Sequence, residues 1–155
     1  MRNLALLTTV ALLATGCGSE STSESAAVSS TYEPGQLWAY HNREGEDESR
    51  LAVLRLDSDP KLGTIVHVSI DGIAIPNAKA PGGVTEEISH LPMSKEALDR
   101  SVREQTGTRP LPDFQEGYKI WRKAHDSGQG GIFTATAAEA VDFVEQAINE
   151  AGSQN

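Results

Sequence analysis

The chain contains few of the residues that would provide covalent cross-links or a basic surface. Cys17 is its one cysteine among 155 residues, so no disulfide can form within the chain and the stability of a folded domain must come from its core. Aromatic residues make up only 5% of the sequence. The 13 Lys and Arg residues face 22 Asp and Glu residues, which gives a net charge of -9. A chain this acidic lacks the basic surface of nucleic-acid-binding proteins, and we expect no nucleic-acid partner.

A hydrophobic run long enough to cross a membrane is also missing from the N-terminal segment. The apolar stretch at residues 4–14 is interrupted by two threonines, whereas a bilayer span needs about 20 apolar residues. A positive charge at Arg2 precedes this stretch, and small residues follow it. This order predicts a secretory signal peptide over residues 1–16. In a plain secretory precursor, a cysteine directly after the small residues would be a coincidence.

The segment Ala14-Thr15-Gly16-Cys17 resembles the lipobox of bacterial lipoproteins. The resemblance implies that the Cys17 thiol receives a diacylglyceryl group and that Cys17 becomes the mature N-terminus. Gly18 stands where an aspartate would resemble an inner-membrane retention signal, so we expect the protein in the outer membrane, facing the periplasm. Removal of residues 1–16 takes away Arg2 and no acid, and the net charge moves from -9 to -10. Anionic lipids would repel such a chain, so the lipid must provide the membrane attachment.

Composition divides the rest of the chain into three parts. Residues 17–31 are the expected lipidated N-terminus and a Ser-rich flexible tether, because almost nothing in them can be buried. Residues 32–150 are long enough for one globular domain and too short for two. We expect a disordered tail over residues 151–155.

The first half of the domain has the pattern of an antiparallel sheet. Strands are predicted at residues 36–40, 51–56 and 65–70, with a short edge strand at 73–75 after an Asp-Gly turn. In the third strand, alternation places Val66, Val68 and Ile70 on one face and Ile65, His67 and Ser69 on the other. We expect the valine face to be buried and the His67 face to be at least partly wet.

The second half has the period of helices. Ser94 is the predicted N-cap of a first helix, which Gly107 can end. Asp113 and Glu116 have the spacing of a capping box for a second helix, which Gly128 ends. Thr136 and Glu139 have the same spacing at the start of a third helix. Residues 132–134 are a short strand candidate. The predicted fold class is α+β, with an antiparallel β-meander of three to four strands followed by about three helices and one further short strand.

No pattern for catalysis or metal binding emerges around the histidines. His67 is followed by Ser69 and Asp71, but residues two apart on a strand stand about 7 Å apart, whereas a nucleophile and its base need about 3 Å. Glu86, Glu87 and His90 lack His-Glu-x-x-His spacing, and Leu91-Pro92 interrupts the segment. We therefore predict no catalytic, cofactor-binding or metal-ligating residue and no cofactor.

The aromatic residues are better candidates for a binding surface. Trp38 and Tyr40 share one strand face, and together with His67 they form the predicted contact surface. Phe114, Tyr118 and Trp121 at helical spacing are expected to belong to the core.

Four segments resemble a small bacterial domain family of uncharacterised function. They are residues 32–38, 65–72, 88–94 and 138–146. The resemblance implies a single domain over residues 32–150 and supplies no site residue. We expect a lipid-anchored, non-enzymatic envelope protein that binds a protein or an envelope component, as an inhibitor, immunity or assembly-accessory protein. The alternative is a small periplasmic hydrolase or metal-dependent enzyme that uses His67 and His90.

Overall fold

The computed structural model describes residues 31–153. The predictions for the signal peptide, for Cys17 and for most of the tether lie outside the described residues, as do residues 154–155. Within residues 31–153 there are five strands, one 3-10 turn and three helices. In chain order they are β1 (Gln36–Tyr40), β2 (Arg50–Asp59), β3 (Gly63–Pro76), η1 (Pro81–Gly83), β4 (Val84–Ser94), α1 (Lys95–Ser101), β5 (Val102–Thr108), α2 (Gln115–Asp126) and α3 (Ala137–Ser153).

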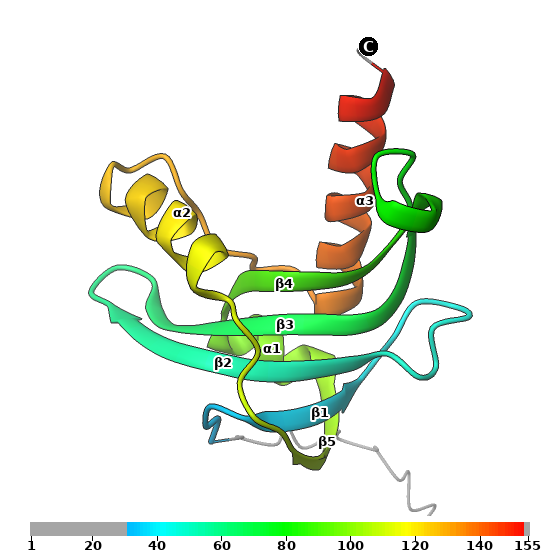
Figure 1. Ribbon diagram of the computed structural model, residues 1–155. Coiled ribbons are helices and arrows are strands. Elements are labelled where there is room, and N and C mark those ends of the chain that lie inside the picture. The colour runs from blue at the N-terminus through cyan, green and yellow to red at the C-terminus, as the bar shows by residue number, and fades with distance from the viewer. Residues whose placement is uncertain (1–30, 154–155) are drawn as a thin grey trace, which may run out of the picture.

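The five strands form one antiparallel sheet in the order β4-β3-β2-β1-β5. The first four are a meander, and the chain then returns through α1 so that β5 lies beside β1 (Figure 1). This arrangement confirms the predicted α+β class with a meander and three helices. Figure 1 also shows α2 beside the β2–β3 turn and α3 beside the β3–β4 connection, so the two helices stand apart.

Several elements differ from those predicted. Strand β4 was not predicted, the predicted strand at residues 132–134 forms only an isolated bridge at Phe133, and two boundaries shift. The first predicted helix ends at Ser101, and the residues up to Thr108 continue as β5, whose polar side chains are mostly exposed. The Asp71-Gly72 pair does not turn the chain back, because β3 runs through it to Pro76 with Gly72 at a φ of 72°. Only glycine adopts this left-handed conformation without strain, and it shifts the register of β3 against β4.

One face of the sheet forms the main hydrophobic core with α1 and α3. Val66, Val68 and Ile70 lie on this face, as their alternation predicted, and Leu98 of α1 and Val141 of α3 pack in the same cluster. Trp38 and Tyr40 also belong to it and are buried. Burial of such side chains is the main source of stability for a domain that has no disulfide.

Side-chain caps fix where two helices begin. The Ser94 side chain accepts a hydrogen bond from the Ala97 amide at 3.1 Å, and the Thr136 hydroxyl accepts one from the Glu139 amide at 3.4 Å. The Glu139 carboxylate in turn accepts from the Thr136 amide at 2.8 Å, which completes the predicted capping box. Helix α3 continues to Ser153, so residues 151–153 are helical instead of part of a disordered tail.

Candidate functional site

The opposite face of the sheet carries two histidines that strand irregularities bring together. His67 lies in the middle of β3, opposite Arg55 of β2 and Pro92 of β4. The register of β4 shifts between the pairs Val68–Leu91 and Ile70–Ile88, so an extra residue enters β4 next to His90. This bulge places the His90 ring over the His67 ring, although 23 positions separate them in sequence.

The two imidazoles form a hydrogen-bonded, stacked pair. Nδ1 of His67 lies 2.9 Å from Nε2 of His90, and the ring planes differ by 16° with centroids 5.1 Å apart. One of these nitrogens must donate the hydrogen bond and the other must accept it. Two imidazolium rings could not make this bond, because both nitrogens would then be donors.

Asp57 on β2 supplies a carboxylate beside the two histidines, and His67, His90 and Asp57 together form the histidine cluster. Its Oδ2 lies 3.4 Å from Nε2 of His67 and accepts a hydrogen bond from the Tyr118 hydroxyl at 2.8 Å. Arg55, two residues earlier on the same strand, donates to Oδ1 of Asp57 at 2.7 Å. Arg122 of α2 lies 3.8 Å from the same carboxylate. Asp57 thus links His67 to helix α2.

Helix α2 covers the histidine pair with aromatic side chains. Tyr118 and Trp121 contact the His67 ring edge-on, with centroids 5.2 and 4.6 Å away. Trp121 stacks on His125 on its other side at 4.8 Å, and Nε2 of His125 lies 3.1 Å from Oδ2 of Asp59. Phe114 and Trp121 are buried, as expected for core residues, and Tyr118 is half-buried. Tyr118 and Trp121 pack on the polar side chains of the second sheet face and are not part of the hydrophobic cluster under α1 and α3.

A glycine sets how closely α2 approaches the sheet. A Cβ atom at Gly117 would lie 2.8 Å from Cβ of His90, which is closer than two carbon atoms can pack. Gly117 therefore has a packing role that offsets its low helix propensity. The helix rests on the histidine pair itself.

Burial changes the acid–base properties of the cluster. Burial, together with the neighbouring His90, lowers the pKa of His67 from 6.5 to about 4. Burial also lowers the pKa of His90. For Asp57, burial raises the pKa, but hydrogen bonds from Tyr118 and Arg55 outweigh it, so the net shift is downward. At neutral pH the cluster therefore holds two neutral imidazoles beside one carboxylate.

The three residues of the predicted contact surface are all covered. Trp38 is 7% exposed, and Tyr40 and His67 are 0% exposed. Tyr40 hydrogen-bonds Ser49 at 2.7 Å inside the core, and Trp38 packs edge-on against Tyr32. They therefore do not offer a contact surface in this structure, because α1 and α3 cover one face of the sheet and α2 covers the other.

The His67 face is buried instead of partly wet. Ser69 is 0% exposed, and its hydroxyl accepts a hydrogen bond from Arg109 at 3.1 Å. Arg109 also pairs with Asp71 through a second nitrogen. The segment that leads into α2 thus closes this face, which strand alternation alone could not reveal.

No metal centre assembles in the part of the chain that the structure describes. Within residues 31–153, no three His, Asp or Glu side chains converge as metal ligands. Glu86 and Glu87 are exposed and precede His90 on β4, whereas the ring of His90 pairs with His67. Among the described residues, no helix is long and apolar enough to cross a membrane.

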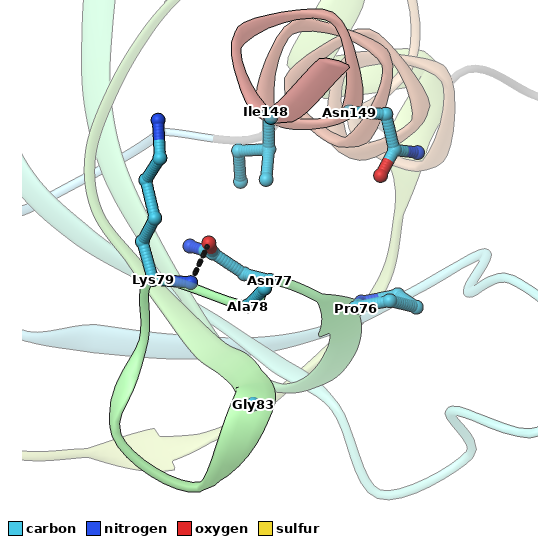
Figure 2. A pocket seen from close by; sticks show the side chains of 8 residues that line it. Pro76, Asn77, Ala78, Lys79, Gly83, Ile148 and Asn149 are labelled. Carbon is cyan, nitrogen blue, oxygen red and sulfur yellow. Dashed lines mark hydrogen bonds between the residues drawn. The ribbon is translucent and has the colours of Figure 1, made fainter. Parts of the chain in front are cut away.

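A surface pocket of about 530 Å³ lies between the β3–β4 connection and the end of α3. Figure 2 shows Asn77 and Lys79 on one side and Ile148 and Asn149 on the other. The Lys79 ammonium donates to the Ala151 carbonyl at 3.1 Å, where a cation offsets the negative end of the helix. None of the histidine-cluster residues lines this pocket.

Comparison with protein-family models, with curated proteins and with solved structures found no match to this chain. The resemblance to a small bacterial domain family therefore stays a prediction. Sequence reasoning had named His67 and His90 but missed Asp57 and Tyr118 as their partners. An acid and a tyrosine 61 positions apart give no sequence signal of their contact.

Proposed function

We propose that this protein is a lipid-anchored protein of the bacterial envelope whose acidic domain binds a partner protein without catalysing a reaction. The observation that carries the proposal is the sequence Ala14-Thr15-Gly16-Cys17 after an apolar stretch. A diacylglyceryl group on Cys17 would anchor the domain through a tether over residues 18–31, whose r.m.s. reach is about 20 Å. The favoured location is the periplasmic side of the outer membrane.

Exposed apolar side chains support the binding role. Ile120 on α2 is 66% exposed and Phe143 on α3 is 54% exposed. Both lie on the outward faces of helices whose other faces cover the sheet, and such side chains are typical anchors of protein interfaces. The net negative charge favours a partner with a basic surface, because charge complementarity speeds association and selects partners.

Lipid labelling tests the anchor. Cells that express the full chain are fed a palmitate analogue, and the Cys17→Ser variant is compared with Ser19→Ala, which keeps the thiol. We expect label and membrane fractionation in the wild type and in Ser19→Ala, and neither in Cys17→Ser. Label that survives in Cys17→Ser would contradict the proposal.

Site-specific photo-cross-linking tests the partner. A photoreactive residue replaces Phe143 or Ile120, with Lys61 in the exposed β2–β3 turn as the control position. We expect a discrete adduct in cells from position 143 or 120 and none from position 61. Equal adducts at all three positions, or none at any, would count against a binding surface on the helices.

The histidine cluster supports a second candidate, a small hydrolase. The series His90, His67, Asp57 has the order of a base whose ring is oriented by a second imidazole and a carboxylate. Because His67 is fully buried, His90 would be the residue that meets a substrate.

A turnover assay separates the two candidates. The full chain is incubated with nitrophenyl acetate and nitrophenyl phosphate, alongside His90→Ala and the exposed control His41→Ala. A hydrolase would lose at least about 100-fold of its rate in His90→Ala alone, as expected for loss of a general base. Equal background rates in all three proteins would leave the binding function as the proposal.

A further inference from the structure

We propose that α2 is a lid that proton uptake by His67 and His90 releases from the sheet. This response of the fold to pH requires neither the lipid anchor nor a partner protein.

The connections of α2 permit such a movement. The helix is preceded by residues 109–114, which have no regular structure and include Pro110 and Pro112, and it is followed by a turn that contains Gly128, Gly130 and Gly131. The chain is fixed again at Phe133, whose amide donates to the Pro92 carbonyl at 2.8 Å. The helix can therefore move as a unit between two irregular segments while the sheet keeps its pairing.

The contacts that hold α2 down are few and mostly made with the polar cluster. Trp121 is the only residue of α2 that is buried. It touches His67 and His125, while Tyr118 touches His67, His90 and Asp57. The main hydrophobic core, in which α1 and α3 pack, contains no residue of α2. A change in the protonation of His67 or His90 therefore acts directly on the side chains that α2 contacts.

The charged and titratable groups around the pair determine the direction of the response. From β2, Arg55 and Asp57 face His67, and from α2, Tyr118 and Arg122 reach the same carboxylate. Asp59 and His125 form a separate pair on the far side of Trp121. Asp57 favours a first proton on His67, whereas burial, His90 and Arg55 oppose it. A second proton on the pair removes the 2.9 Å hydrogen bond and places two like charges in contact.

The pKa values of the two histidines determine whether α2 opens as pH falls or as it rises. Under the closed lid the pKa of His67 is about 4, and that of His90 is also lowered, whereas an uncovered imidazole titrates near 6.5. Below about pH 6.5 the open form takes up protons that the closed form does not bind. The ratio of open to closed molecules therefore rises as pH falls, by up to about tenfold per pH unit for each proton, and for the proton on His67 this rise continues to about pH 4. Above pH 6.5 the closed form keeps its full stability.

Acrylamide quenching of Trp121 measures the opening. The full chain in detergent carries Trp38→Phe, so that Trp121 is its one tryptophan, and is titrated from pH 7.5 to 4.5. We expect quenching to rise as pH falls through the range below 6.5, while the far-ultraviolet circular dichroism of the sheet and the other helices persists. The double variant His67→Gln, His90→Gln should lose this pH dependence, whereas the exposed control His41→Gln should keep it.

Three results would contradict the proposal that α2 is a pH-dependent lid. They are quenching that does not change with pH, the same change in the double variant, and loss of all secondary structure together with the exposure of Trp121. If the double variant does not fold, carbon NMR of the imidazoles in the Trp38→Phe chain decides the matter. Protonation of His67 and His90 must then coincide with exposure of Trp121, and exposure while both rings are still neutral would contradict the proposal.

Discussion

The sheet face under α1 and α3 is closed by apolar side chains, most of them aliphatic, whereas the face under α2 is closed by two imidazoles and a carboxylate beneath aromatic rings. On the first face, Val66, Val68 and Leu98 belong to one buried hydrophobic cluster, and the packing of these side chains does not depend on protonation. On the second, Tyr118 of α2 donates a hydrogen bond to the Asp57 carboxylate, and His67 and His90 beneath the helix share a hydrogen bond that two imidazolium rings could not make. One sheet thus carries a permanent core on one side and a pH-dependent contact on the other.

The largest effect is expected from a charge on the aliphatic face. Val68→Asp places a carboxylate at a fully buried site without a partner, and should cost at least about 4 kcal/mol, which is a large part of the stability of a small domain. Urea unfolding of the purified chain measures it, with the exposed substitution Ser58→Asp as the matched control. A midpoint close to that of the control would show that the valine face is not the core.

A smaller loss is expected from the same charge on the opposite face. In Ser69→Asp the new carboxylate is also buried, but it meets the Arg109 guanidinium, so the cost should be about 2 kcal/mol. Alternation alone had suggested a mild effect, because the face was expected to be wet. Urea midpoints for the two variants order them, and greater damage from Ser69→Asp than from Val68→Asp would reverse the assignment of the faces.

Gly117→Ala sets helix propensity against packing. Alanine would stabilise an isolated helix by about 1 kcal/mol, but its Cβ would collide with Cβ of His90. We expect a net loss of about 1 kcal/mol, with faster amide exchange in α2 and unchanged exchange in α3. A stabilised protein would mean that α2 does not lie this close to β4. Gly152→Ala, near the end of α3 where space is open, is the control.

The smallest effect is expected for Tyr118→Phe. It removes only the hydroxyl that donates to Asp57, and because Tyr118 is half-buried the cost should be about 1 kcal/mol or less. The variant should also open α2 slightly at every pH without abolishing the pH response. Acrylamide quenching of Trp121 at pH 7 and pH 5 detects both, and a complete loss of the response would assign it to Tyr118 instead of the histidines.

Local patterns predicted the parts of the fold that depend on neighbouring residues. The caps at Ser94 and Thr136 and the alternation of Val66, Val68 and Ile70 each involve residues within four positions of one another, and the structure confirms all three. Strands β4 and β5 were both missed. Strand β5 is polar and mostly exposed on an edge, so it carries no hydrophobic alternation. Its strand conformation comes from pairing with β1, which local propensity does not reveal.

The histidine cluster could not be predicted, for a related reason. Whether His67 meets His90 depends on the register of β3 against β4. That register shifts at a bulge, and no residue type in the sequence indicates where the bulge lies. The partner Asp57 likewise reaches His67 through the β2–β3 register, which shifts at Leu54. Each shift moves side chains along the sheet by one position, and their combined result appears only in three dimensions.

Residue-resolved hydrogen exchange at pH 7 and pH 5 tests whether the two faces of the sheet differ in their response to protons. After correction for the intrinsic effect of pH on exchange, we predict that the amides of α2 lose protection by at least about tenfold at pH 5. The amides of α3 and of the centre of β3 should keep theirs. Equal loss of protection in α2 and α3, or none in either, would contradict the account.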